Sequence, residues 1–561
     1  MGRGTAREPT GPEVLRRDAT TSPLHGLVRE HLETFLARFQ DEHGGRRLPR
    51  HVEQELRGFL ACGDPAHGFC RIHCPHCSSD LLVPFSCKGR AFCPSCGGRR
   101  MAEVAANLIE RVLPPVPVRQ WVLSVPWALR LRMACDPRLC RAVARAFLRA
   151  VSASYRRSAG EQGLLEFGPD PEGPCAEPPC PEAPCAEALR ADPLRAPRAH
   201  AGAVNFVQRF GSSLALNVHF HALFLDGAHV VRGPASRPRF HPAPPLTPDE
   251  LHRVQRDIVR RIERVLRRRG ILQDDPASDD GALEDSDTLL PFVQAASLQS
   301  KVALGPDSGR PIPRLIDPAA CLGPSSPSTA SAPHPDELRC EQAGFSLHAA
   351  TRIEADDRDR LERLVRYVAR PALAQGRLEV RGDGRVKWSL RRPWRDGTRA
   401  FVFDPLTFLE RLVALVPHPR EHQWTYFGIL APASPLRDAV VPRRTVASSG
   451  PRPAPGIGEA EPEAEPCAKP QRQSWAELLQ RTFAVDVLRC PTCGGRCQRV
   501  ATLTDPLVAR RILKHLRLRA EPPPLAPSAG AVHAPPLCSP STKPQDPLLR
   551  QVAAWIAYPP S

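Results

Sequence analysis

"GAVNFVQRFGSSLALNVHFHALFLDG", residues 202–227, contains two runs of strand-forming residues separated by a short Gly-Ser-Ser segment. This pattern predicts a β-hairpin with strands over 202–210 and 214–227. Successive side chains of a strand point to opposite faces, so Asn217, His219 and His221 are expected on one face. The other face is continuously apolar and suits a hydrophobic core, with Leu214, Leu216, Val218, Phe220, Ala222 and Phe224.

The His219-Phe220-His221 triplet places two imidazoles on the same face of the second strand. Their Cα atoms are expected about 6.5–7 Å apart, which allows both rings to reach one cation. Alternatively, the two histidines are partly exposed on the sheet and bind no metal. The pattern of this strand alone favours that second interpretation. The rest of the sequence has to decide between them.

The composition indicates a multidomain protein with a polyanionic partner. A length of 561 residues suffices for roughly two to four domains, and 65 prolines indicate that part of the chain is linker. The 77 basic and 60 acidic residues give a net charge of +17, which suits nucleic acid.

The sequence also indicates where the protein resides. No apolar run approaches the roughly 18 residues of a membrane span, so no membrane association is expected. The N-terminal segment lacks the apolar stretch of a signal peptide. Many of the 19 cysteines fall in Cys-x-x-Cys pairs, which indicate metal sites in a reducing compartment. We therefore expect a cytoplasmic protein.

The order of the predicted elements indicates an α+β chain. It comprises an N-terminal helical and zinc-ribbon module, a central antiparallel sheet flanked by helices, and a small C-terminal Cys-knuckle module. Apolar periodicity predicts helices over 99–113, 251–270 and 357–370, and 377–403 has the pattern of a strand meander. The expected divisions are 24–113, 114–431 with low-complexity insertions at 169–198 and 322–335, a disordered linker at 432–470, a module at 474–519 and a Pro-rich tail at 520–561.

The N-terminal module carries two Cys-x-x-Cys pairs fifteen residues apart, Cys74/Cys77 and Cys93/Cys96. This spacing is typical of a zinc ribbon, in which two knuckles supply four thiolates to one tetrahedral Zn²⁺. A closed four-thiolate site leaves no position for water, so the zinc is expected to be structural. Cys62 and Cys87 lie in the same segment and are candidates for a second zinc, or are reduced thiols packed in a core.

A third pair, Cys490 and Cys493, lies in "CPTCGGRC", which repeats "CPSCGGR" of residues 93–99 almost letter for letter. With Cys497 this pair predicts another candidate zinc knuckle. A fourth ligand, such as His515, is needed to complete such a site.

Four stretches in this order, 68–103, 204–227, 344–374 and 392–417, resemble the rolling-circle transposases of the insertion-sequence-91 type. Those proteins are HUH-superfamily nucleases with an N-terminal zinc-binding domain. The resemblance implies a DNA-binding zinc domain over 24–113 and an HUH-type catalytic domain over 114–431. It also implies a single-stranded DNA endonuclease and strand transferase acting at the ends of a mobile element.

The resemblance assigns roles to particular residues. His219 and His221 become ligands of Mg²⁺ or Mn²⁺, and Tyr367 becomes the nucleophile that forms a 5′-phosphotyrosine. Gln208 on the partner strand is a candidate third ligand, or else a hydrogen-bonded sheet residue. The predicted helix of Tyr367 also carries three arginines suited to DNA phosphates, Arg360, Arg363 and Arg370.

The sequence departs from the two-tyrosine relatives. The positions four residues from Tyr367 are Arg363 and Pro371, so the chain resembles a single-tyrosine subgroup. A two-strand reaction then requires Tyr367 to act twice, a second subunit through self-association, or Tyr426. No Gly-x-x-x-x-Gly-Lys-Ser/Thr stretch is present, so unwinding is assigned to host replication and helicase proteins.

Two other functions remain open at this point. One is a zinc-dependent DNA-binding protein without cleavage activity. The other is a histidine-metal hydrolase with a different substrate.

Overall fold

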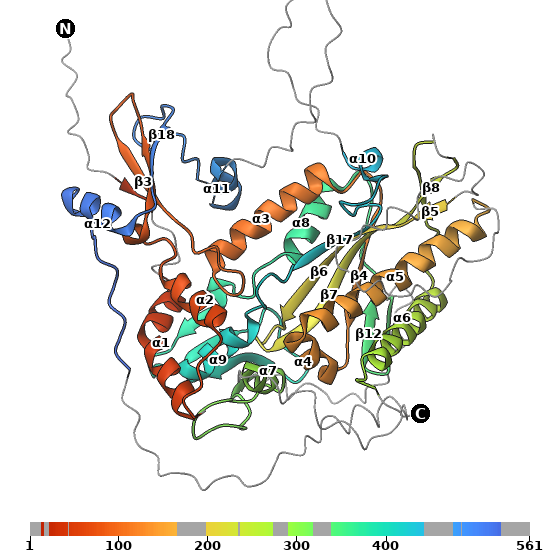
Figure 1. Cartoon of the computed structure of the whole chain (residues 1–561), viewed down its shortest axis with the longest axis horizontal. Helices are drawn as coiled ribbons and strands as arrows, with labels where there is room; N and C mark the ends of the chain where they lie inside the picture. The colour runs from red at the N-terminus through yellow and green to blue at the C-terminus, as the bar shows by residue number, and fades with distance from the viewer. Residues whose placement is uncertain are drawn as a thin grey trace, which may run out of the picture.

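The computed structural model describes nine segments of the chain: 13–15, 22–42, 44–164, 198–233, 236–272, 290–317, 338–442, 475–483 and 485–528. The predicted insertion at 169–198, apart from its last residue, the predicted insertion at 322–335, most of the 432–470 linker and the tail beyond 528 lie outside these segments. The described segments form an α+β structure, as the sequence predicts, with several antiparallel sheets (Figure 1).

The central sheet has seven strands, and all its pairs are antiparallel. Along the path the order is β11-β12-β4-β7-β6-β17, and β13 pairs with β4. The strands are β4 (Val118–Ser124), β6 (Gly202–Phe210), β7 (Leu216–Leu225), β11 (Arg339–Gln342), β12 (Phe345–His348), β13 (Arg352–Ile353) and β17 (Trp424–Gly428). The predicted hairpin of 202–227 is therefore confirmed, and it forms the middle of the sheet.

Helices cover both faces of this sheet. On one face lie α3 (Pro94–Arg111) and α8 (Arg358–Val368), whose apolar side chains pack with Leu223 and Leu225 of β7. On the other face lie α4 (Trp127–Cys135), α5 (Pro137–Glu161) and α6 (Pro248–Arg268) (Figure 1). There Phe147 of α5 contacts Phe220 of β7, with ring centroids 6.3 Å apart. The alternation of β7 thus buries its apolar residues against α5.

Two further sheets extend the central body. One consists of β10 (Arg314–Ile316), β16 (Thr398–Phe403), β15 (Val386–Ser389) and β14 (Leu378–Val380), which confirms the meander over 377–403. The other contains β5 (Arg198–His200), β8 (Gly227–Val231) and β9 (Arg239–Pro242). The helices that share the core of the first of these sheets are α1 (Pro23–Glu42), α2 (Arg50–Leu60), α7 (Leu290–Leu298) and α9 (Pro405–Leu415). The second packs against Ala159 near the end of α5.

The fourth sheet joins the two ends of the chain. Its order is β1-β3-β2-β18, with β1 (Glu13–Val14), β3 (Asp80–Pro84), β2 (Phe69–His73) and β18 (Gln498–Leu503). Around it lie η1 (Pro65–His67), α11 (Trp475–Phe483) and α12 (Pro506–His515), while α10 (Arg437–Val440) lies near the central sheet. Figure 1 shows the blue C-terminal elements β18, α11 and α12 beside the red β3.

No helix in the described part of the chain is long and apolar enough to cross a membrane.

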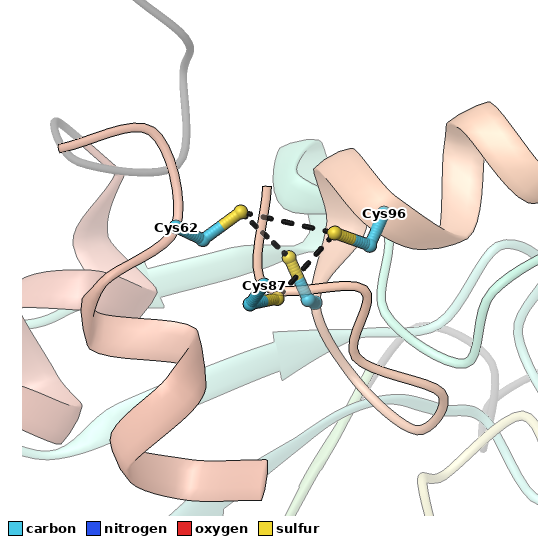
Figure 2. Close-up of side chains that lie close together, drawn as sticks. Cys62, Cys87 and Cys96 are labelled. Atoms are coloured by element: carbon cyan, nitrogen blue, oxygen red, sulfur yellow. Dashed lines mark hydrogen bonds between the residues drawn. The ribbon is translucent and has the colours of Figure 1, made fainter. Parts of the chain in front are cut away.

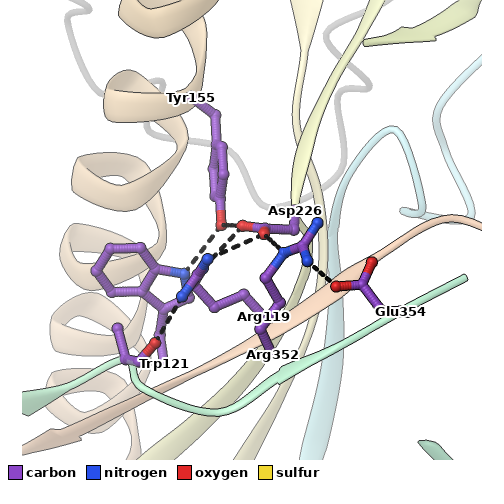
Figure 3. Close-up of polar contacts among 7 residues, drawn as sticks. Arg119, Trp121, Tyr155, Asp226, Arg352 and Glu354 are labelled. Carbon is purple, nitrogen blue, oxygen red and sulfur yellow. Dashed lines mark hydrogen bonds and ion pairs between the residues drawn. The ribbon is translucent and has the colours of Figure 1, made fainter. Parts of the chain in front are cut away.

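A buried ion network ties the end of β7 to its neighbours (Figure 3). Asp226, 1% exposed, accepts two hydrogen bonds from the Arg119 guanidinium at 2.9 and 3.1 Å. Arg352 of β13 donates to the same carboxylate at 2.7 Å, and the Tyr155 hydroxyl of α5 donates at 2.8 Å. Burial, followed by the charge of Asp226, raises the pKa of Tyr155 well above its usual value. The network therefore connects β4, β7, β13 and α5 through one carboxylate.

We predict that Asp226→Ala lowers the free energy of unfolding by about 3–5 kcal/mol, because it leaves the buried Arg119 without its partner. Chemical denaturation measures the change. Asp257→Ala is the matched control, since its pair with Arg261 at 2.9 Å is partly exposed and contributes less than about 1 kcal/mol. Equal losses in the two variants would contradict the role given to the network.

Candidate active site and metal sites

The two histidines of β7 lie side by side on the sheet face covered by α3 and α8. Their ring centroids are 5.0 Å apart. His221 is 5% exposed and His219 is half-buried. The register places Gln208 directly opposite His219 on β6, and Ser124 opposite it on β4.

The hydrogen bond of the His219 ring leaves its Nε2 ready for a metal, whereas the same state of His221 requires the Gln120 amide to turn over. The Nδ1 of His219 lies 2.8 Å from the carbonyl oxygen of Asn217, which can only accept, so Nδ1 carries the proton and Nε2 the lone pair. The Nδ1 of His221 accepts a hydrogen bond from the Gln120 Nε2 at 2.8 Å, which places the proton on the His221 Nε2, and this Nε2 has no partner among the described residues. Rotation of this amide by a half-turn would bring the Gln120 Oε1 to the place of Nε2, so that Nδ1–H would donate to it and the Nε2 lone pair would face a cation.

Both imidazoles are held neutral. Burial lowers the pKa of His219 to about 4, and the positive charges of Arg130 and Arg370 act in the same direction. Burial, followed by His219, Arg370 and His348, lowers the pKa of His221 well below its usual value. A neutral imidazole is the form that binds metal, so the pair fits a divalent cation near pH 7.

Tyr367 lies on α8 next to the histidines, although almost 150 residues separate them in the sequence. Its ring centroid is 6.2 Å from that of His221, with the two rings edge to face. The side chain is 43% exposed, while Leu361, Val365 and Val368 on the apolar side of the helix are buried. The helix therefore docks by its apolar stripe and leaves the tyrosine beside the histidine pair.

Of the three arginines expected to contact DNA, only Arg370 lies against the tyrosine. Its guanidinium carbon is 4.1 Å from the Tyr367 ring centroid and 5.5 Å from that of Phe210. Arg360 and Arg363 are exposed on α8. A pocket next to this group has four arginines in its lining, Arg90, Arg100, Arg209 and Arg370, and joins the zinc-binding segment to the end of α8.

Gln208 connects the histidine strand pair to the tyrosine helix. It is 4% exposed, and its Nε2 donates to the carbonyl oxygen of Val368 at 2.7 Å. Its Oε1 has no hydrogen-bond partner in the described segments. The sequence predicts Gln208 as a candidate ligand but gives no reason to single out Gln120. The pairing of β4 with β7 brings Gln120 to His221, and no local pattern encodes that pairing.

A first group of four cysteines lies where α2, α3 and the loop after β3 meet: Cys62, Cys87, Cys93 and Cys96. Figure 2 shows the Cys62, Cys87 and Cys96 sulfurs turned toward one another. The Sγ–Sγ distances are 3.8 Å for Cys62–Cys96, 3.6 Å for Cys62–Cys93 and 3.4 Å for Cys87–Cys96. Four sulfurs about 2.3 Å from a tetrahedral zinc are about 3.8 Å apart, so the group fits Zn²⁺.

A second group contains Cys74, Cys77, Cys490 and Cys493. The Sγ–Sγ distance is 3.5 Å both for Cys74–Cys493 and for Cys77–Cys490. The ligand atoms of this group also lie within 4.8 Å of one another.

The expected grouping of Cys74, Cys77, Cys93 and Cys96 around one zinc needs correction. The segment between the two pairs folds as the β2–β3 hairpin, in which His73 pairs with Asp80 and Phe69 with Pro84. Cys74 and Cys77 lie in the turn at its tip, whereas Cys93 and Cys96 lie beyond its base, at the start of α3. Five strand residues separate tip from base by about 16 Å, so the two pairs join different groups.

Cys62 and Cys87, named as candidates for a second zinc, complete the group of Cys93 and Cys96. Cys490 and Cys493 join Cys74 and Cys77, so neither His515 nor Cys497 is needed as the fourth ligand.

Comparisons with known protein families identify the class of this chain. The family described as "Transposase zinc-binding domain" matches residues 27–125, and the family described as "Putative transposase" matches residues 202–437. The chain is therefore a transposase with a zinc-binding domain, and the cysteine groups support structural zinc. It belongs to the insertion-sequence-91-type transposases. No curated protein and no solved structure gives a significant match.

We predict that Cys96→Ser removes one zinc ion per chain and lowers the thermal midpoint of the N-terminal domain, because it breaks a closed four-thiolate site. Metal analysis by mass spectrometry measures the zinc. Cys140→Ser is the control, since this thiol is buried in α5 outside both groups. Unchanged zinc content in Cys96→Ser would exclude the site.

Proposed function

We propose that this transposase nicks and rejoins single-stranded DNA at the ends of its mobile element, with Tyr367 as the nucleophile. The observation that carries the proposal is the position of the Tyr367 ring, 6.2 Å from that of His221 on the face where both histidines lie. A phenol is a weak nucleophile near neutral pH and reacts best with a phosphate that is already polarised.

His219 and His221 would hold Mg²⁺ or Mn²⁺ through Nε2, and the cation would supply Lewis-acid polarisation of the scissile phosphate. The unpartnered Nε2 of His221 and Oε1 of Gln208 support this assignment, because two buried polar atoms without partners point to a missing ligand. Gln208 would be the third protein ligand and would also hold the end of the tyrosine helix through Val368.

Tyr367 would form the new bond between its phenolic oxygen and phosphorus. The bond between phosphorus and the 3′ oxygen would break, the leaving oxygen would take up a proton, and the 5′ phosphate would stay on the tyrosine. Attack by a 3′ hydroxyl on this phosphotyrosine reverses the step, so rejoining needs no ATP. Arg370 beside the ring, with Arg360 and Arg363 along α8, would bind neighbouring phosphates.

A single nucleophile is consistent with the environment of the other tyrosine on this face. Tyr426 lies on β17, and its hydroxyl accepts a hydrogen bond from Asn107 of α3 at 3.3 Å. Processing of a second strand would then use Tyr367 twice or a second subunit, and host helicases would supply the single strand.

We predict that a labelled single-stranded oligonucleotide containing the element end forms a covalent adduct with the wild-type chain and none with Tyr367→Phe. Denaturing electrophoresis measures the adduct. Tyr426→Phe is the matched control and keeps the adduct, since it removes a hydroxyl from the same sheet face. Binding without an adduct in the wild type would favour a non-catalytic DNA-binding protein, and cleavage that survives Tyr367→Phe would favour a histidine-metal hydrolase.

We predict that Gln208→Ala weakens Mn²⁺ binding by about tenfold or more, because it removes one oxygen ligand and a contact that orients the site. Isothermal titration calorimetry measures the affinity. Tyr367→Phe separates metal binding from chemistry and binds Mn²⁺ like the wild type. An unchanged affinity in Gln208→Ala would mean that this residue only holds the helix.

A further inference from the structure

The second cysteine group joins residues more than 400 positions apart in the chain. Cys77 and Cys490, whose sulfurs are 3.5 Å apart, are separated by 413 residues. Each pair occupies a tight turn: the amide of Ser78 donates to the carbonyl of Cys74 at 2.8 Å, and that of Gly494 to the carbonyl of Cys490 at 2.9 Å. The two turns are therefore a matching pair of knuckles from opposite ends of the chain.

The geometry of this group favours a metal over disulfides. Sulfurs 3.5 Å apart are far beyond the bond length of about 2.0 Å in a disulfide. Their separation is close to the distance of about 3.8 Å expected between any two of four sulfurs around a tetrahedral zinc.

The strands around these knuckles complete the arrangement. β18, which follows the second knuckle, pairs antiparallel with β2, which leads into the first. Together with β3 they form one sheet, in which the first knuckle lies at the tip of the β2–β3 hairpin and the second lies just before β18. This is the arrangement of a zinc ribbon, here divided so that the entire central domain lies between its two halves.

We infer that Cys74, Cys77, Cys490 and Cys493 bind a second structural zinc, which fastens the C-terminal segment 475–528 to the N-terminal zinc-binding domain. The family match to that domain covers residues 27–125 and so contains only half of these ligands. The inference does not depend on the nuclease chemistry proposed for Tyr367.

The apolar contacts of the C-terminal segment are modest, so the metal has a large share in holding it. One small core combines Leu479 and Val487 with Ile72 and Val83. Another places Leu513 of α12 against Phe69 of β2. With nine and ten residues, α11 and α12 are too short to be stable helices by themselves.

Two polar contacts reinforce the junction. Arg481 of α11 pairs with Glu110 of α3 at 2.6 Å, and Arg519 reaches the buried Asp64 at 3.5 Å. The Arg481–Glu110 pair is substantially exposed and contributes little. The position of the segment therefore depends mainly on the zinc, the pairing of β18 with β2 and the two small cores.

The two zinc sites differ in their access to solvent. All four thiols of the first group are buried or half-buried, whereas Cys493 of the second group is exposed. A chelator would therefore remove the zinc of the second group first, and the C-terminal segment would be released while the first group stays closed.

Zinc content tests the shared site directly. We expect two zinc ions per chain in the wild type, one in Cys77→Ser, one in Cys493→Ser and still one in the double variant, because both thiols bind the same ion. Cys70→Ser is the matched control, since this thiol lies in β2 outside both groups and keeps two ions. Two ions in Cys493→Ser, or none in the double variant, would overturn the assignment.

The fastening role has a separate test in the full chain. A site for a specific protease is placed between residues 442 and 475, and the cleaved protein is passed over a size-exclusion column. The C-terminal fragment should co-elute in zinc-replete buffer and separate after chelation or in Cys493→Ser. Co-elution that survives both treatments would show that the small cores hold the segment without the metal, and would overturn the role.

Discussion

The antiparallel register of β7 with its two neighbours is the constraint on which the candidate active site depends. It sets His219 opposite Gln208 on one side and Ser124 on the other. A shift by one residue would turn both imidazoles toward α5 and move the apolar side chains to the face of α8. The burial of Phe220 and its apolar neighbours therefore determines where the histidines point. One strand, β7, supplies core residues on one face and the two histidines on the other.

Hydrogen bonds connect both ends of the tyrosine helix α8 to the β6–β7 hairpin. Before α8, Arg352 donates to Asp226 at the end of β7, and after Tyr367 the carbonyl of Val368 accepts from Gln208 of β6. Arg358 at the start of the helix also donates to the Leu113 carbonyl, at 3.1 Å. Such contacts fix the position of a nucleophile better than an apolar stripe alone, because a stripe permits small rotations of the helix.

Local sequence patterns were sufficient to predict much of the fold and part of the candidate active site. The hairpin of 202–227 and the helix of Tyr367 follow from alternation and from the 3.6-residue period, both of which act over short distances. The hydrogen bond from Gln120 and the ion network of Asp226 depend on which strand lies beside β7, and no local pattern encodes that choice. The same limit explains the cysteine groups. Spacing identified the knuckles, but the partner of each knuckle is set by the hairpin that separates Cys74 from Cys93.

The free energy of zinc binding is large enough to hold together a zinc ribbon whose two halves come from opposite ends of the chain. Closing a loop of 413 residues rather than one of fifteen costs about 3 kcal/mol more in chain entropy, because this cost grows only with the logarithm of length. Four thiolates binding zinc contribute roughly 10–16 kcal/mol, which exceeds that difference several-fold. The central domain is itself folded and shortens the free path between the knuckles, so the true cost is smaller still. A zinc site can therefore be assembled from opposite ends of the chain, and sequence separation alone is no argument against it.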